Sequence, residues 1–529
     1  MIWQKELNSD LYVDLLLNVE YPVNLVRLKR QKHNGNAMEA RIAGNEKYKA
    51  GDFYGAMTKY NQSICLAEND SECISLAYAN RSCCFYKLNL FSHCLVDIQL
   101  AKESNYPEHL MHKLVDREHE CERQINSQKS IPKVPTLSFA ASESLPCMSE
   151  NLQIDVSEKY HRRITAVEDI PIGSVVIVEE DYVRFVVGDN VKCNNCGKKY
   201  LNFVPCKKCG GAMFCSAQCS NNDFHQIECE MYFDVTICRE GNFFPLLVLR
   251  SVLIGLNVFS SMDEMIEFVE NCNSTDPFEI PLSISSAASK YRTFFKLSSF
   301  ESDMGMLDYR KVAFYVYHTI KTSILAAKFK NKSHDRFLAH LITHHCRVIQ
   351  TNSFGSFDAT LTAGDETTDI SNDYEQSVRL VSSYFNHSCC PNVANFRKDN
   401  LSVCITVLPV RKGEQLFISY VDEDDDEYNT EINRQQFLLR NFGFRCTCPI
   451  CENGILKNSF RLQDDPVFIN IVDDLSKIET TRDMSTVRKI IENCKQFLVK
   501  HSNLILSAES IYVKHNLIAM MQIEMDDEV

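Results

Sequence analysis

Three features are missing from this sequence, and each absence excludes a class of protein. No apolar run approaches the roughly 18–20 residues that a helix needs to cross a bilayer, so no membrane partner is expected. The N-terminus has no signal-type core, because Asp14 and Asn18 interrupt the apolar stretch Leu11–Val19. Positive charge is not in excess: the net charge is −14, which argues against strong direct nucleic-acid binding. We therefore expect a soluble intracellular protein.

Cysteine, in contrast, is abundant, with 24 residues. In a chain without a secretory signal, reduced thiols and bound zinc explain so many cysteines better than disulfides do. Eight candidate ligands crowd into residues 193–229, and they are Cys193, Cys196, Cys206, Cys209, Cys215, Cys219, His225 and Cys229. Eight ligands fill two tetrahedral sites and leave no position for water, so both ions are predicted to be structural.

The stretch Tyr384–Tyr420 has the pattern of a functional site. A dense polar and cysteine run, residues 386–392, follows an apolar approach. Two strand-like runs come next, Val393–Phe396 and Leu401–Val407, and a third, Gln415–Tyr420, ends in a lone tyrosine. We expect a polar site at the mouth of small antiparallel strands. A second cysteine motif, Cys-x-Cys-x2-Cys at residues 446–451, follows this stretch.

The rest of the chain predicts an α+β multidomain protein. Gly44–Tyr60, followed by Tyr-Ala-Asn-Arg-Ser at residues 78–82, resembles tetratricopeptide repeats, which bind a peptide or chaperone in their groove. The alternative is a docking array without a peptide ligand. The predicted segments are an N-terminal segment (1–36), a helical array (37–125), a linker (126–152), a strand region (153–190), the cysteine module (193–229), a helical insertion (231–350), a second strand region (351–421), a cysteine-bearing tail (422–454) and C-terminal helices (455–529).

Three motifs together resemble the SET- and MYND-domain (SMYD) protein-lysine methyltransferases. They are Asn-His-Ser-Cys at 386–389, Gly-Glu-x-Leu-x-Ile-Ser-Tyr at 413–420, and the tail cysteines. The array before them resembles the branch of that family with tetratricopeptide repeats. The resemblance implies a split SET domain, interrupted by a MYND zinc finger at 193–229 and by the helical insertion. It groups the ligands into three zinc sites: Cys193, Cys196, Cys215 and Cys219; Cys206, Cys209, His225 and Cys229; and Cys389 with Cys446, Cys448 and Cys451.

The resemblance also implies an activity, the transfer of a methyl group from S-adenosylmethionine to a lysine of a histone or other protein. Asn386 and His387 would contact this cofactor, and Phe444 would pack on it. Tyr420 would lie near the cofactor as the catalytic residue and orient the transfer, and Phe354 and Phe442 would line the lysine channel. Each has a plainer alternative, as turn former, strand-end tyrosine or core aromatic.

One stretch departs from the family pattern. Where the family has glycines in the first SET loop, this chain has Glu158–Arg162 without glycine. Either the large side chains there crowd the cofactor, or the loop lies slightly further out. The alternative function is therefore an adaptor with a catalytically weak SET domain. In that case the MYND module would recruit proline-rich segments, and partners such as histone deacetylase complexes would link the chain to transcriptional repression. The family resemblance gives the cytoplasm and nucleus as the expected location.

Overall fold

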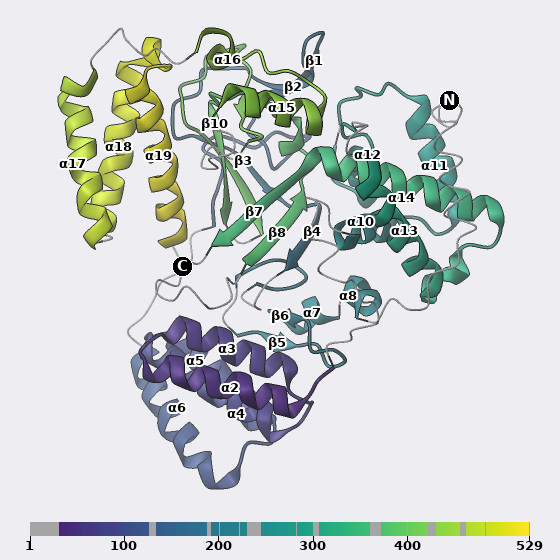
Figure 1. Ribbon diagram of the computed structural model, residues 1–529, viewed down its shortest axis with the longest axis vertical. Helices are drawn as coiled ribbons and strands as arrows, with labels where there is room; N and C mark the ends of the chain where they lie inside the picture. Colours follow the sequence, from purple (N-terminus) through teal and green to yellow (C-terminus); the bar gives the residue numbers. More distant parts are fainter. Residues whose placement is uncertain are drawn as a thin grey trace.

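The computed structural model describes most of the chain, and the architecture is shown in Figure 1. The described residues are 31–125, 134–187, 192–199, 202–221, 223–229, 245–281, 283–299, 306–359, 372–398, 400–421, 430–454, 462–481 and 483–527. Residues 1–30 of the predicted N-terminal segment lie outside them. Figure 1 shows a helical array at one end, the cysteine module above it, strands at the centre, and helical layers on either side of the strands.

The array has five α-helices, in agreement with its sequence pattern. They are α2 (Asn34–Lys49), α3 (Phe53–Leu66), α4 (Glu72–Lys87), α5 (Phe91–Glu103) and α6 (Met111–Ile125). Small residues let neighbouring helices approach: a Cβ on Gly44 would lie 2.5 Å from the ring of Tyr60, which is itself buried. Successive helices pack as antiparallel pairs, as expected for repeats of this type.

Short strands from both halves of the SET region make the central layer. One sheet has the order β10 (Val393–Lys398), β11 (Leu401–Thr406), β3 (Val175–Glu180), and the other has β4 (Val183–Val187), β8 (Asn372–Val378), β7 (Ser353–Ala359). Both are antiparallel. Separate pairs are β1 (Leu152–Ser157) with β2 (His161–Ala166), and β5 (Val204–Pro205) with β6 (Met213–Phe214) in the module. The predicted split is confirmed, because β3 and β11 pair across the module and the insertion.

The predicted linker is wrong in its second half. Residues 134–151 do not connect two bodies loosely; they lie along β3, where Ser149 donates its N–H to the carbonyl of Val176 and Cys147 accepts one from Val178. Leu145 and Met148 are buried in the SET core. Ser, Pro and Lys dominate this segment, so its few apolar anchors gave too weak a pattern for a strand or a strap to be predicted.

The insertion is helical, as predicted, and covers β4. Its helices are α10 (Pro245–Val258), α11 (Met262–Ser274), α12 (Ala287–Phe295), α13 (Met306–Thr322) and α14 (Lys332–Asn352), with the turn η3 (Ile324–Lys328). The helix α12 was not predicted. Among the described residues, no single helix has the length and composition of a membrane span. The helices α10 and α11 meet these two criteria only when they are taken together, and they are bent by 107° at the break between them.

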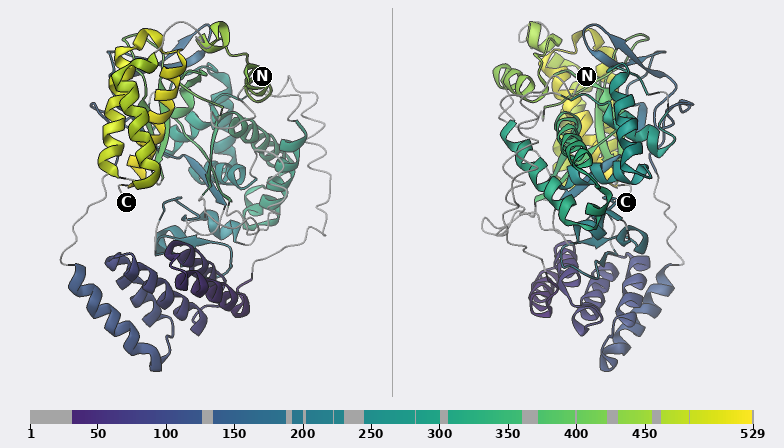
Figure 2. Two further views of the ribbon diagram at one scale, coloured as in Figure 1. Left: turned by 60° about the vertical axis from the view of Figure 1, so that its left-hand side comes forward. Right: turned by 90° about the vertical axis from the view of Figure 1, so that its right-hand side faces the viewer.

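Three C-terminal helices close the other side of the strands. They are α17 (Pro466–Thr481), α18 (Met484–Lys500) and α19 (Ala508–Asp527), close to the predicted helical pieces. Their buried apolar residues form one core with Phe396, Val403 and Ile405 of the sheet. Both views in Figure 2 show this bundle against the strands and away from the array.

Candidate functional site

Two distant segments meet where the sequence predicted the site. The strand β9 (Asn386–His387) pairs with β12 (Phe417–Ile418), with Phe417 opposite Asn386 and Ile418 opposite His387. The pair is parallel, whereas antiparallel strands were expected. The chain therefore enters the site twice in the same direction, and this places Tyr420, just after β12, beside the polar run.

Tyr420 lies in an aromatic enclosure. Its ring centroid is 4.7 Å from that of Phe442, 6.3 Å from Phe444 and 5.4 Å from His387. Its hydroxyl donates a hydrogen bond of 2.6 Å to the backbone carbonyl of Phe385. Burial raises the pKa of the Tyr420 hydroxyl well above its usual range, so the group is neutral at physiological pH.

A helix that the sequence did not reveal sets the place of Phe442 and Phe444. It is α15 (Glu431–Phe442), capped at Thr430, and Gly443 ends it with φ +75°. The left-handed residue reverses the chain direction, so Phe442 at the helix end and Phe444 after it both lie against Tyr420. The first turns of this helix are largely polar and most of its apolar residues cluster at 437–439, so no helical periodicity was apparent in the sequence.

The third cysteine cluster has the geometry of a metal site. The Sγ atoms of Cys389, Cys446, Cys448 and Cys451 lie within 4.8 Å of one another. Cys389 is 4.0 Å from Cys446 and 3.7 Å from Cys451, sulfur to sulfur. A tetrahedral zinc with bonds of about 2.3 Å requires sulfurs about 3.8 Å apart. The four thiols, which are the group that the family resemblance implied, thus fit one zinc ion, and this ion would fasten the tail over the strands.

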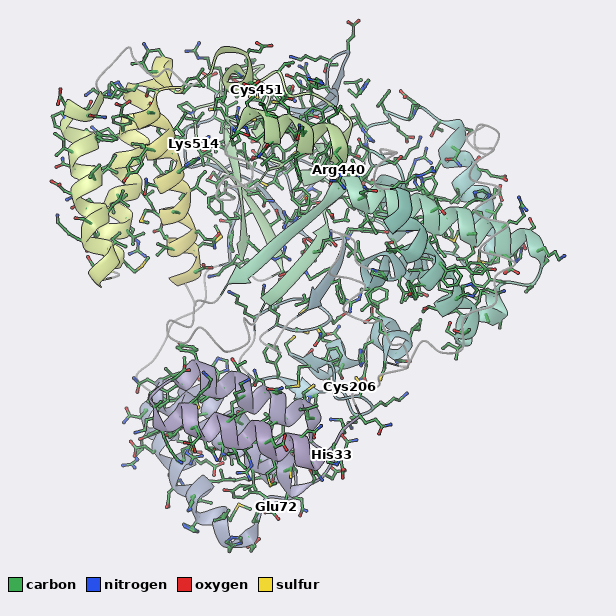
Figure 3. All side chains as sticks on the ribbon, viewed as in Figure 1. His33, Glu72, Cys206, Arg440, Cys451 and Lys514 are labelled. Carbon is green, nitrogen blue, oxygen red and sulfur yellow. The ribbon has the colours of Figure 1, made fainter. Side chains whose placement is uncertain are left out.

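The other two clusters form in the module with the predicted ligand groups. In the first, Cys215 is 3.6 Å from Cys196 and 3.7 Å from Cys219, sulfur to sulfur. In the second, Cys206 is 3.7 Å from Cys229, and Cys209 is 3.7 Å from Nε2 of His225. These spacings again fit zinc, with all four positions of each site taken by protein. Figure 3 marks Cys206 near the array and Cys451 at the opposite end of the molecule.

The array docks directly on the module. Arg81 of α4 and Asp97 of α5 form a fully buried ion pair, with two nitrogen–oxygen distances of 2.7 Å. Arg81 also donates to the carbonyl of Phe203, and the amide of Asn202 donates to Asp97 at 2.7 Å. Array and module share one apolar core. This favours the docking alternative for at least one face of the array.

The first SET loop adopts a glycine-like backbone without glycine. His161 has φ +53°, in the left-handed region that histidine enters more readily than most residues. Its ring stacks on Phe278 at 4.3 Å, and the ring of Tyr160 lies 5.6 Å from Phe417. Asn386 donates its side-chain amide to the carbonyl of Arg162 at 3.0 Å. The loop is thus held to β9, and its large rings are packed on neighbouring aromatics.

Phe354 lies on β7, where the Arg379 guanidinium sits 4.3 Å from its ring centroid. Phe354 is packed against the main core, whereas Phe442 and Phe444 belong to the cluster around Val421 and Leu438. Tyr420 borders both groups. The role of Phe354 in a lysine channel stays a prediction.

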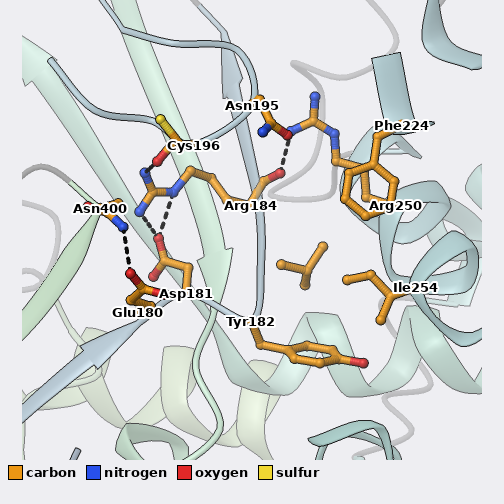
Figure 4. Close-up of a pocket in the computed structure, with 11 residues that line it drawn as sticks. Glu180, Asp181, Tyr182, Arg184, Asn195, Cys196, Phe224, Arg250, Ile254 and Asn400 are labelled. Carbon is orange, nitrogen blue, oxygen red and sulfur yellow. Dashed lines mark hydrogen bonds and ion pairs between the residues drawn. The ribbon is translucent and has the colours of Figure 1, made fainter. Parts of the chain in front are cut away.

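A pocket lies elsewhere, between the SET strands and the module (Figure 4). It is partly open and has a volume of about 220 Å³, and its walls include Tyr182 of the SET region, Phe224 of α8 (Asp223–Glu228) and Ile254 of α10. At its edge Asp181 accepts from Arg184, Arg379 and Arg397. Burial alone would raise the pKa of Asp181, but the three guanidinium groups outweigh it and lower the pKa to about 2.

Comparison with known proteins places these features in one family. The family model described as "SET domain" matches residues 161–421, which include β9, β12 and Tyr420. The chain thus carries a SET domain at residues 161–421, and the relatives it matches include proteins named SMYD4. It is similar to the "Protein-lysine N-methyltransferase SMYD4" of Danio rerio, 29% identical over 39% of this chain and 30% of the relative. The Pongo abelii protein of the same name is 21% identical over 84% of this chain and 70% of its own length.

A SET and MYND domain-containing protein of Dictyostelium discoideum is 24% identical, over 57% of this chain and 81% of its own length. The chain spans only 30% of the Danio rerio relative and 37% of the Homo sapiens one. Among solved structures, the SET domain of LSMT bound to lysine and AdoHcy aligns over 72% of this chain with 11% identity and a TM-score of 0.26. That likeness is too low to support any argument.

Proposed function

We propose that this SET-domain chain is a protein-lysine N-methyltransferase that takes its methyl group from S-adenosylmethionine. The observation that carries the proposal is Tyr420, which is half-buried with a neutral hydroxyl between β9, β12 and the Phe442–Phe444 turn. The names of the matched relatives point to the same activity. The substrate class is a protein with an exposed lysine, such as a histone.

Methyl transfer to an amine requires orientation and dryness more than acid–base chemistry. S-adenosylmethionine supplies an electrophilic methyl group when it is bound. Tyr420 suits an orienting role, since its hydroxyl proton is committed to the Phe385 carbonyl and its oxygen lone pairs remain to face a polarised methyl group or an amine. Phe442 offers an aromatic wall beside this oxygen, which favours a cationic head on an apolar stem.

The residues proposed to hold the cofactor adjoin this tyrosine, whose ring centroid is 5.4 Å from that of His387 and 6.3 Å from that of Phe444. Asn386 and His387 form β9, and Phe444 lies 6.2 Å from the His387 ring. The amide of Asn386 is engaged with the first loop, so we propose that Asn386 acts through its carbonyl oxygen and its backbone. The glycine-like turn at His161 supports a loop that approaches the cofactor despite its large side chains, because their rings are already packed.

Calorimetry and turnover test the proposal together. The full chain should bind S-adenosylmethionine, and Asn386→Ala should weaken that binding. Tyr420→Phe should abolish methyl transfer to a histone or protein lysate while it leaves cofactor affinity largely intact. Tyr54→Phe is the matched control, since Tyr54 is 64% exposed on the array and far from the site. Equal turnover by Tyr420→Phe contradicts the role assigned to Tyr420. The absence of heat with wild type at high cofactor concentration contradicts the enzyme and leaves the adaptor.

We also propose that the MYND module takes a proline-rich segment on the side away from the array. The array covers the module near Asn202 and Phe203. The pocket on the other side has Phe224, Tyr182 and Ile254 as apolar walls, which suit a proline ring. Such a segment would link the chain to partners such as histone deacetylase complexes in the nucleus, besides substrates in the cytoplasm. Phe224→Ala should weaken the binding of a proline-rich peptide, measured by fluorescence anisotropy. Unchanged affinity would show that the peptide does not bind in this pocket.

A further inference from the structure

His387 contacts two parts of the site with its two ring nitrogens. Nδ1 lies 3.0 Å from the backbone nitrogen of Tyr420, which donates its N–H to it. Nε2 lies 3.3 Å from Sγ of Cys389, one of the four sulfurs of the third metal cluster. The ring is buried, with 5% of its surface exposed.

These contacts define the protonation of the ring. Because Nδ1 accepts the Tyr420 N–H, the ring proton of the neutral imidazole resides on Nε2. Nε2–H then points to Cys389, whose sulfur is a thiolate when it ligates zinc. A hydrogen bond to a metal ligand fixes its orientation and stabilises its charge. The same ring that supports the ligand therefore also fixes the backbone at Tyr420.

We propose that His387 is a positioning residue that couples occupancy of the third zinc site to the placement of Tyr420. With zinc bound, the Cys389 thiolate holds the imidazole by its Nε2–H, and Nδ1 holds the Tyr420 amide. With zinc removed, Cys389 loses its fixed place and the ring is no longer held on that side. The coupling is structural, and its relevance for catalysis rests on the proposed methyltransferase function.

Two conservative substitutions separate the two contacts. The Asn side chain in His387→Asn reaches the place of Nδ1 and keeps an acceptor for Tyr420, but it offers no donor near Cys389. The Gln side chain in His387→Gln reaches the place of Nε2 and keeps a donor for Cys389, but it offers no acceptor for Tyr420. A purely packing role would make the two variants behave alike.

The readouts do not depend on activity. Alkylation of cysteines during a chelator challenge, followed by mass spectrometry of the peptide with Cys446 and Cys451, reports zinc loss from the third site. Hydrogen exchange of the Tyr420 amide reports its bond to Nδ1. We expect His387→Asn to lose zinc about tenfold faster with the Tyr420 amide still protected. We expect His387→Gln to keep zinc near the wild-type rate with a more rapidly exchanging Tyr420 amide.

The ligand Cys206 serves as the internal control, because Figure 3 shows it far from Cys451 of the third site, and its alkylation should not change. In wild type, chelation of the third zinc should deprotect the Tyr420 amide. The proposal is overturned if both variants show the same pattern, or if chelation leaves that amide as protected as before. If wild type transfers no methyl group, the proposed enzyme fails, while the opposite patterns of the two variants still decide the coupling.

Discussion

The docking of the array on the zinc module gives the sharpest stability prediction. The perturbation is Asp97→Ala. Both side chains of the Arg81–Asp97 pair are fully buried, and Asp97 also accepts from Asn202 of the module. The substitution therefore leaves a buried guanidinium without its counter-charge and an amide of the module without its acceptor.

The expected cost is large because the charge is not exposed to water. Removal of one partner of a buried ion pair typically costs about 3–5 kcal/mol. Solvent would screen the charge at an exposed pair, where the cost is below about 1 kcal/mol. The matched control is Glu46→Gln, which breaks the Lys49–Glu46 pair of α2, whose side chains are 70% and 66% exposed.

Native-state hydrogen exchange is the appropriate assay, since a chain with several domains has no single free energy of unfolding. A loss of about 3 kcal/mol or more speeds the exchange of protected amides by about a hundredfold or more. We expect this acceleration in α4 and also around Asn202 and Cys206 of the module. We further expect faster alkylation of Cys206 during a zinc challenge than of Cys451.

The reasoning is refuted if Asp97→Ala exchanges no faster than Glu46→Gln. It is partly refuted if α4 is destabilised while the module keeps its protection. The array would then be stable on its own account, and the contact with Asn202 would contribute nothing to the module.

Three further outcomes are expected. Because the pKa of Asp181 is lowered in the folded state, the unfolded chain takes up the proton first as the pH falls. About 2 kcal/mol of stability is present above about pH 4 and is lost toward pH 2. Acid titration of the Asp181→Asn variant should lack this loss of stability. Gly443→Ala forces a Cβ into φ +75° and should cost about 1 kcal/mol, seen as faster hydrogen exchange in α15, with weaker cofactor binding; unchanged exchange in α15 would contradict the cap. Met148→Ala should cost about 2–5 kcal/mol, whereas Val134→Ala at a 68% exposed position should cost almost nothing; equal effects would refute the strap.

The sequence predicted most of what depends on spacing. Ligand pairs such as Cys206 with Cys209 follow from turn spacing, and the family resemblance implied how the pairs combine. The three clusters have the members that it implied. The array, the β10–β11 hairpin and the C-terminal helices also follow from periodicity. The site was predicted from its motifs and not from periodicity. The proximity of Asn386 and Tyr420 depends on a parallel strand pairing, which local patterns do not encode.

What the sequence did not reveal depends on contacts between distant segments. The strap at Leu145 and Met148 has too few apolar residues for a period, and only the SET core shows why they are buried. The positive φ of His161 is invisible in a loop without glycine, although it is the kind of turn that the absent glycines would have predicted. The second role of His387 needed the positions of both Cys389 and the Tyr420 amide.

The split of the SET sheet has a consequence for synthesis of the chain. Glu180 ends β3, and its hydrogen-bond partner Asn400 is 220 positions later in the sequence. On the ribosome, the array and the zinc module can fold before β11 has been synthesised. Until then the edge of β3 that pairs with β11 is open and can pair with other chains. Translation that halts within the insertion would release a product with two finished parts and an open sheet edge. Such a truncated chain is expected to load its two module zincs and yet aggregate.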